Sequence, residues 1–436
     1  MKKIIFFALL VSLSLEQVQI KRSQRSKHGE DCVSDYACEE GFLCKTYRCF
    51  TKFESNHLKE LGLLEKNLCN LQKRCPSDKK CVKHRCIDKD TPLELPKNKS
   101  ANIDDVHLLF AGGIELNQKP YLSGLKPDKT VNYDHLFTHI TSYIKGADLA
   151  VVAQESPLYI QEGKLIKNYK KTPKELADAI ANAGFKVVLH AASAAYNHKE
   201  KGIIDTLNYW KTKHPDVHPL GIASTLEESQ KDYYLFEKNN IKIGIINYSA
   251  FAGKSIPKKN KFMVNIISKQ KVEECITQLK KEADFIIVCI NWGEKYSRSP
   301  NKNEMKWAKE LAKLGANLIV GNFPSYIQPA TYVKAENGNC ALVIFSLGNL
   351  VEENTKNKSA LSALANIIIS KENGKAFISS FNLIPTINHV VASSEYSVYK
   401  LSEYTDNLGK EVNKKFSLEK TKDICRKIMG AFAHCG

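Results

Sequence analysis

The chain has 436 residues, of which 43% are hydrophobic and 25% charged, and these proportions are ordinary for a globular protein and exclude a disordered or fibrous one. The length accommodates one large domain or two to three smaller ones. The formal net charge of +17 favours an anionic partner such as an acidic polymer or a polyanionic surface. The alternative is that the basic residues only form a solvated surface. The absence of a nucleic-acid-binding motif argues against nucleic acid as the partner.

Residues 1–17 are predicted to be a signal peptide. Lys2 and Lys3 precede an apolar run from Ile4 to Leu15, which is too short to cross a bilayer as a helix. A buried N-terminal helix is the alternative. No later stretch is long and apolar enough to span a membrane, so we expect a mature protein without a transmembrane segment, secreted to the extracellular space or the secretory lumen. Residues 18–31 are predicted to be a flexible basic segment.

Two cysteine-rich modules follow, at residues 32–49 and 69–86, and both have the spacing C-x5-C-x5-C-x4-C. Each module is too small to bury a core, so we expect disulfides within it. Pairing between the modules and zinc binding are alternatives, although the spacing lacks the tight C-x2-C pairs that suit zinc. The spacing resembles that of small secreted Dickkopf-N or EB modules, which implies a spacer or binding role. The cysteines are Cys32, Cys38, Cys44, Cys49, Cys69, Cys75, Cys81 and Cys86.

A linker rich in Pro, Lys, Ser and Asn is predicted at residues 91–103, before a large domain at 104–388. Asn98 and Asn357 begin Asn-Lys-Ser sequons and are candidate glycosylation sites. Asn247 also begins a sequon, but it ends an apolar strand and is the least suitable of the three.

The large domain alternates predicted helices and strands. Two helical stretches have clear end signals, since one starts at Thr172-Pro173 and ends at Gly184, and the other ends at Gly315. Helix, glycine and apolar strand in succession are typical of a layered α/β domain. The predicted strands are Val106–Phe110, Leu149–Ala153, Val187–Leu189, Lys242–Asn247, Phe285–Cys289, Leu318–Val320 and Ala341–Phe345.

The end of the chain differs from this alternation. Residues 365–384 predict a β-hairpin whose turn is Glu372-Asn373-Gly374, which favours a mixed sheet or two stacked sheets. Residues 389–436 are predicted to form a polar C-terminal tail that ends in a short helix. Cys425 and Cys435 in this tail are candidates for a disulfide.

In open α/β sheets, chemistry gathers at the carboxyl ends of the strands. Here the segments around those ends are FAGGIEL, ADLAVVAQESP, HAASA followed by GIIDTLNYW, NWGEKY, GNFPSYIQP and FSLGN. In this order they resemble the CapA family of bacterial poly-γ-glutamate capsule synthesis proteins, in the calcineurin-like metallophosphoesterase superfamily. The family forms are FxGDxML, ADLxxxNLESP, LANNH before a G-hydrophobic-DTL helix, HWGxEY, GHHPHxxQP and YSLGNF. The resemblance implies a four-layer α/β/β/α sandwich.

The resemblance also implies one or two divalent metal ions, held by Asp, Asn and His at the strand ends. Of the family's acidic and imidazole groups at this site, only Glu155 is present. Gly, Ala and Phe carry no donor atom, and Asn is a weak neutral ligand. The cleft is therefore expected to hold no metal cofactor, and Glu155 to cap backbone amides or to act as a leftover acid or base. The replaced positions are Gly113, Ala153, Ala192, Ser193, Ala194, Asn291, Asn322, Phe323 and Ser325.

Relocated ligands are an alternative, because His190, His198 and Glu200 lie near the replaced Asn-Asn-His segment. A metal-free hydrolase would need a nucleophile with a base. Ser193 and Cys289 are single candidates, and neither has a local signature such as a G-x-S-x-G turn.

The favoured hypothesis is a secreted pseudoenzyme that binds a ligand in a metal-free cleft, with an anionic polymer such as poly-γ-glutamate as the expected partner. A metal-dependent hydrolase with relocated ligands is one alternative. An adhesion or matrix protein that binds through its cysteine modules is the other.

Overall fold

The protein is described by a computed structural model that covers residues 105–160, 171–252, 256–353, 361–392, 395–433 and Cys435, together with two short hairpins nearer the N-terminus. The chain divides into two compact units, Met1–Lys97 and Asn98–Gly436. The predicted signal peptide, basic segment and linker lie outside the described residues, as do Asn98 and Asn357. Among the described residues, no helix has the length and hydropathy needed to cross a membrane.

In the first unit, each cysteine-rich module contains one antiparallel hairpin. The strands are β1 (Phe42–Lys45), β2 (Arg48–Thr51), β3 (Lys79–Val82) and β4 (Arg85–Asp88). Cys44 lies opposite Cys49 in the first hairpin, and Cys81 lies opposite Cys86 in the second. The two modules therefore share a register as well as a spacing. The disulfide partners of the eight cysteines lie outside what the structure describes and stay a prediction.

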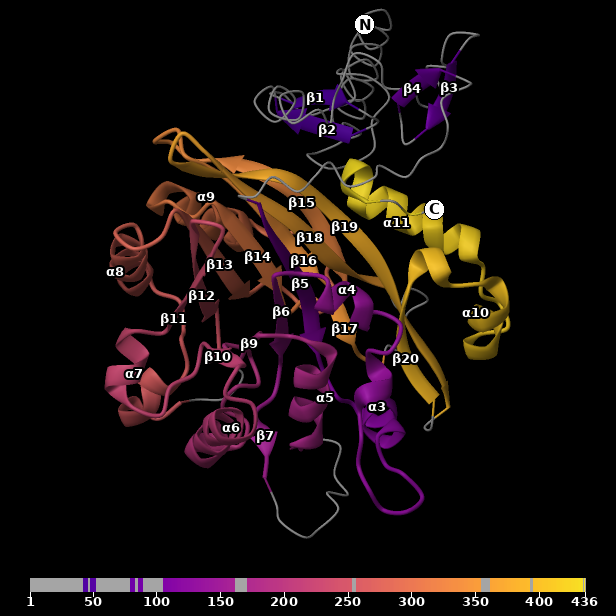
Figure 1. The fold of residues 1–436 in the computed structure, drawn as a ribbon, viewed down its shortest axis with the longest axis horizontal. Coiled ribbons are helices and arrows are strands. Elements are labelled where there is room, and N and C mark those ends of the chain that lie inside the picture. Colours follow the sequence, from indigo (N-terminus) through magenta and orange to yellow (C-terminus); the bar gives the residue numbers. More distant parts are fainter. Residues whose placement is uncertain are drawn as a thin grey trace, which may run out of the picture. The chain divides into compact units, whose positions relative to one another are not determined.

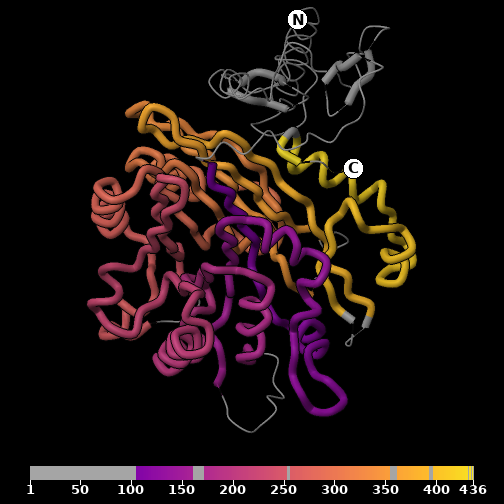
Figure 2. The backbone as a smooth tube through the Cα atoms, viewed as in Figure 1, coloured from indigo at the N-terminus to yellow at the C-terminus, as the bar shows by residue number. Residues whose placement is uncertain are grey.

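The second unit contains two large sheets. The first has the strand order β10-β9-β6-β5-β18-β19-β20, with β17 beside β5. Its first four strands are parallel, whereas β18, β19 and β20 run antiparallel. In Figure 2 the indigo strand β5, at the start of the domain, lies beside the orange strand β18, which comes late in the sequence. The bounds are β5 (Val106–Ile114), β6 (Leu149–Gln154), β9 (Val187–Leu189), β10 (His218–Leu220), β17 (Asn349–Val351), β18 (Leu361–Glu372), β19 (Lys375–Ala392) and β20 (Glu395–Lys400).

The second sheet has the order β11-β12-β13-β14-β16-β15. Its central strands β12, β13, β14 and β16 are parallel, and antiparallel strands close both edges. A separate short pair, β7 (Leu158–Tyr159) and β8 (Thr172–Pro173), lies outside both sheets. The bounds are β11 (Tyr233–Lys238), β12 (Ile241–Ser249), β13 (Phe285–Asn291), β14 (Leu318–Asn322), β15 (Ile327–Lys334) and β16 (Cys340–Leu347).

Helices cover the outer face of each sheet, and the two sheets face one another (Figure 1). In β5, Leu109 and Ala111 pack into the core beneath α5, whereas Leu108 and Phe110 are buried on the opposite face. The expected α/β/β/α sandwich is confirmed. The helices are α3 (Gln118–Ser123), α4 (Thr141–Lys145), α5 (Glu175–Ala183), α6 (Lys199–Lys213), α7 (Leu226–Gln230), α8 (Lys269–Leu279), α9 (Lys302–Leu314), α10 (Asp406–Val412) and α11 (Leu418–Met429), with 3-10 turns η2 (Asp134–Leu136), η3 (Lys258–Met263), η4 (Leu401–Glu403) and η5 (Gly430–Phe432).

The predicted helix ends are correct and one predicted start is wrong. Gly184 and Gly315 terminate α5 and α9 with φ values of 108° and 114°, which favour glycine. Thr172 and Pro173 do not start α5, because they form β8, and the helix begins only at Glu175. Asn301 begins α9 in a capping box.

The late hairpin forms as expected, and its turn consists of Asn373 and Gly374, with φ values of 49° and 76°. Positive φ at both positions suits the right-handed twist of the strands. The segment that follows is more ordered than a polar tail, because β19 runs on to Ala392 and β20 pairs with it. Residues after 388 therefore extend the first sheet before they form α10 and α11.

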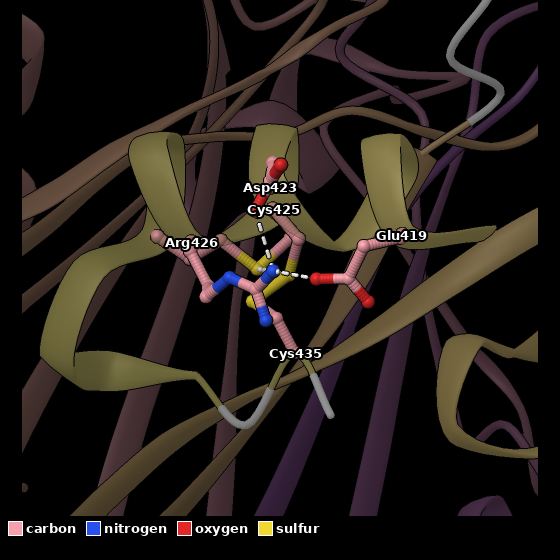
Figure 3. Close-up of a disulfide and its surroundings, with 6 residues drawn as sticks. Glu419, Asp423, Cys425, Arg426 and Cys435 are labelled. Carbon is pink, nitrogen blue, oxygen red and sulfur yellow. Dashed lines mark hydrogen bonds and ion pairs between the residues drawn. A yellow bond between two sulfur atoms is a disulfide. The ribbon is translucent and has the colours of Figure 1, made fainter. Parts of the chain in front are cut away.

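Cys425 on α11 forms a disulfide with Cys435, with a Cα–Cα distance of 5.7 Å (Figure 3). Arg426 lies beside it and pairs with Glu419 and Asp423 on the same helix. The bridge closes a loop at the C-terminus of the described chain. It fulfils the pairing expected for these two cysteines.

Replacing Cys435 with serine is expected to lower the free energy of unfolding by about 2–3 kcal/mol. The bridge joins residues 10 positions apart, and a crosslink over such a loop restricts the unfolded chain by roughly that much free energy. Urea unfolding followed by tryptophan fluorescence measures the change. A Cys425→Ser variant should match Cys435→Ser, and unequal losses would contradict an effect that comes from the bridge alone.

Candidate functional site

The candidate site lies where the strands β5, β6, β13 and β14 end. Gly113 in β5 lies opposite Ala153 in β6 and opposite Asn349 in β17. Asn291, which ends β13, lies opposite Asn322, which ends β14. The topology therefore brings together positions that are far apart in the sequence.

The two glycines of β5 make room for different neighbours. A Cβ atom on Gly112 would lie 1.8 Å from the backbone oxygen of Gly348, so only glycine allows this approach of two chains. A Cβ atom on Gly113 would lie 2.6 Å from Oδ1 of Asn349 and 3.2 Å from Oε1 of Glu155. Nδ2 of Asn322 would also lie 3.2 Å away, so any side chain at this position requires a shift of the polar side-chain ends around it.

Glu155 is the centre of the site. Its Oε1 accepts hydrogen bonds from Nδ2 of Asn291 at 3.1 Å and from Nδ2 of Asn322 at 3.3 Å. The expectation that Glu155 caps backbone amides is wrong, because these donors are side-chain amides. The side chain is 6% exposed, and burial, together with the charges of Glu115 and Glu352, raises the pKa of Glu155 to about 8.

A second buried carboxyl, Glu352, belongs to the same site and was not predicted. It accepts hydrogen bonds from Ser325 Oγ at 3.2 Å and from Asn349 Nδ2 at 3.1 Å. Burial and the nearby charge of Glu115 raise the pKa of Glu352 to about 7. The acidic pair Glu352-Glu353 just after the FSLGN segment was the available signal.

The ammonium group of Lys295 lies near these carboxyls. Nζ of Lys295 contacts the two carboxylate oxygens of Glu115 at 3.0 and 2.9 Å. Lys295 lowers the pKa values of both Glu155 and Glu352, but less than burial raises them. The buried pair therefore retains raised pKa values despite a lysine nearby.

The residues at the site do not suit the divalent ions that the resemblance implies. Asn291 and Asn322 turn their NH₂ groups toward Glu155, and an NH₂ group cannot bind a cation. The Oδ1 atoms of Asn322 and Asn349 accept no hydrogen bond within the described residues. Two neutral oxygens and two carboxyls that already accept hydrogen bonds, without an imidazole or a thiolate, are nevertheless weak ligands for zinc or iron. No group of three His, Cys, Asp or Glu side chains that could hold a metal occurs in the described part of the chain.

The other replaced positions lie in two segments, the turn after β9 and the residue after β14. Ala192, Ser193 and Ala194 form the turn after β9, where the N–H of Ala195 donates to the oxygen of Ala192 at 3.1 Å. Phe323 has a φ of 99°, unusual for a non-glycine residue, and its ring lies 4.7 Å from that of Phe251. Among the described residues, the carboxyl of Glu155 has no hydrogen bond with either segment, since its partners are Asn291 and Asn322.

The alternative ligands and nucleophiles do not converge on Glu155. His190 is buried and accepts a hydrogen bond from Nε1 of Trp210 at 2.9 Å. Glu200 accepts one from Nδ2 of Asn260 at 3.1 Å, and His198 packs its ring against Tyr159. Cys289 is fully buried in β13, where burial raises the pKa of its thiol and keeps it protonated.

Comparison with known proteins places these features in context. The model of the family "Bacterial capsule synthesis protein PGA_cap" matches residues 107–354. The PGA biosynthesis protein CapA of Bacillus subtilis is 25% identical over 287 residues, which are 64% of this chain and 71% of that protein. The capsule biosynthesis protein CapA of Bacillus anthracis is 25% identical over 259 residues, which are 56% of this chain and 60% of that protein.

Solved phosphoesterases overlap more loosely. A calcineurin-like phosphoesterase of Bacillus subtilis has a TM-score of 0.39 at 14% identity, covering 74% of this chain and 99% of the other. A putative 5'-nucleotidase of Staphylococcus aureus has a TM-score of 0.38 at 12% identity, covering 72% and 58%. Neither value bears on what this chain binds or cleaves.

Proposed function

Because this chain belongs to the PGA_cap family of bacterial capsule synthesis proteins, we propose that it is a non-catalytic member that binds an acidic polymer. The observation that carries the proposal is the pair of side-chain amides at the ends of β13 and β14. Asn291 and Asn322 stand where the family forms have His, and their NH₂ groups occupy Glu155. Metal-dependent phosphoester chemistry needs anionic or imidazole ligands at these strand ends.

Metal content and turnover test the first half of the proposal. The purified full chain is expected to contain only traces of zinc, manganese and iron, and not to hydrolyse bis-p-nitrophenyl phosphate above the buffer rate when each metal is added. Metal at one or two equivalents together with turnover would overturn it. Metal without turnover would show a bound ion and still leave the chain non-catalytic.

The polymer would bind at a basic and aromatic surface, here called the β13 loop surface, which consists of Lys295, Tyr296 and Arg298 on the loop after β13 and of the largely buried Tyr326 on the loop after β14. Tyr296 is 44% exposed, and its ring lies 5.8 Å from that of Tyr326. The guanidinium of Arg298 lies 4.8 Å from the centroid of the Tyr326 ring. A guanidinium held over a ring can offer paired N–H donors to carboxylates. The net charge of +17 adds long-range attraction for a polyanion.

Binding of poly-γ-glutamate to the Arg298→Ala variant is expected to be roughly tenfold weaker than to the unaltered chain, because one charge-assisted contact is lost. Fluorescence anisotropy with labelled polymer at two salt concentrations measures it. Arg426→Ala is the matched control, since Arg426 lies on α11 and pairs with Glu419 and Asp423. Equal loss in both variants would indicate a general charge effect and reject this surface.

We also propose that the protein is secreted. The leader-like residues 1–17 and the cysteine-rich modules support this, and so does the Cys425–Cys435 bridge, because such crosslinks persist in oxidising compartments. Removal of residues 1–17 should retain the chain inside the cell, as fractionation and immunoblotting would show.

A further inference from the structure

A cavity of about 570 Å³ lies between the edge strands of the two sheets, and it is distinct from the site of Glu155. One wall is β10 with the end of α6, and the other is α7 with the start of β11. None of the residues that line it belongs to the cleft of Glu155. Its volume is in the range of small-molecule sites.

Much of the lining is apolar or aromatic. Leu207, Val217 and Ile222 supply aliphatic surface, and the ring of His218 stacks on that of Tyr234 with centroids 4.2 Å apart. Such a lining favours a ligand with an apolar body, because burying that body removes its surface from water. The stacked rings also present a face that attracts a cation.

The lining contains one more carboxylate than it contains cationic side chains. Lys211, Lys231, Glu227 and Glu228 line the cavity with two charges of each sign. Burial lowers the pKa of His218, so its imidazole is neutral at neutral pH. The remaining charge is that of Asp232.

Asp232 has acceptor capacity to spare. Its two oxygens share a single donor, the N–H of Gly221, at 3.1 and 3.0 Å. A carboxylate can accept about four hydrogen bonds. Within the described chain, no lysine, arginine or histidine forms an ion pair with Asp232. Removal from water, with the charge of Glu228 adding to it, raises the pKa of Asp232 to about 7, although the N–H of Gly221 and the charge of Lys271 lower it. An added cation would therefore find a carboxyl without an ion-pair partner among the described residues.

We propose that this cavity binds a small primary amine with an apolar body, whose ammonium group contacts Asp232 while the body packs against Leu207, Val217 and Ile222. The stacked pair of His218 and Tyr234 forms the adjoining wall. The site is independent of the proposed polymer binding, because neither the β13 loop surface nor the cleft contributes to it.

The probe pair is cyclohexylamine, which is protonated at neutral pH, and its neutral counterpart cyclohexanol. Ligand-observed NMR titrations use the full chain. Cyclohexylamine is expected to bind at least roughly tenfold more tightly than cyclohexanol, because one charge-assisted contact separates the two. The Asp232→Asn variant is expected to lose about the same factor for cyclohexylamine and to keep its weak affinity for cyclohexanol.

Asparagine retains an acceptor for the N–H of Gly221, so the variant should fold, and tryptophan fluorescence checks that it does. Glu237→Gln is the matched control, because Glu237 lies on β11, the strand that directly follows Asp232, is exposed and does not line the cavity. Equal affinities for the two probes would overturn the proposal without any variant. Unchanged amine affinity in Asp232→Asn would also overturn it, as would a loss of the same size in Glu237→Gln.

Discussion

Replacing Gly113 with aspartate is expected to lower the free energy of unfolding by about 3–5 kcal/mol and not to create a phosphoesterase. The new Cβ atom would lie 2.6 Å from Oδ1 of Asn349, and the carboxylate would extend toward Glu155. The substitution therefore combines overpacking with a buried charge beside another carboxyl. Restoring the family residue at one position cannot restore the site, because Ala153 and Ala194 still offer no donor atom and Asn291 and Asn322 still stand in place of His.

Urea unfolding followed by tryptophan fluorescence measures this prediction, since all three tryptophans, Trp210, Trp292 and Trp307, lie in the large domain. Gly374→Asp is the matched control. No atom lies within 4 Å of a Cβ added there, and aspartate tolerates its positive φ, so a loss of about 1 kcal/mol or less is expected. A Gly113→Asp variant as stable as the unaltered chain, with stoichiometric metal, would reject the loss of the metal site.

The second large effect is a dependence of stability on pH that comes from Glu155. Its pKa is about 8 in the folded chain and 4.5 ordinarily, so the folded state holds a proton that the unfolded state releases between these values. The stabilising contribution is complete below pH 4.5 and is lost as the pH rises through 8. Each pH unit in this window changes the free energy of unfolding by up to about 1.4 kcal/mol.

Glu155→Gln isolates this contribution, because glutamine keeps an acceptor for Asn291 and Asn322 and does not ionise. The stability difference between Glu155→Gln and the unaltered chain should grow in favour of the variant from pH 6 to pH 8. Among the other groups that titrate there, His190 does not contact Glu155, so its contribution cancels in the difference, whereas Glu352 is coupled to Glu155 by charge and contributes to it. A difference that stays constant over this range would show that Glu155 is already ionised in the folded chain.

Much of the fold was predictable because its signals are local. The seven predicted strands all form, and several extend beyond their predicted ends, as β5 does through Gly112 to Ile114. The turn at Asn373-Gly374 was predictable for the same reason, since two adjacent residues that tolerate positive φ specify it.

The missed strands have weaker local signals. Strand β10 has only three residues, and β15 contains Pro329, which is tolerated because β15 lies at a sheet edge. Strand β20 was taken as part of a polar tail, although Tyr396 and Val398 point into the core. A short or polar strand is stabilised by its neighbours, and its own sequence does not identify them.

By itself, the sequence determined which donor atoms exist at the strand ends, because Gly113, Ala153 and Ala194 cannot supply a ligand in any conformation. It could not decide which side chains meet at these strand ends. That was decided by the pairing of β17 with β5, which places Asn349 against Gly113, and by the ends of β13 and β14, from which two amides donate to Glu155. The same holds for the cavity at Asp232, which exists only because the edges of two sheets lie side by side. Donor chemistry belongs to single residues, whereas space, burial and raised pKa values arise from contacts between distant segments.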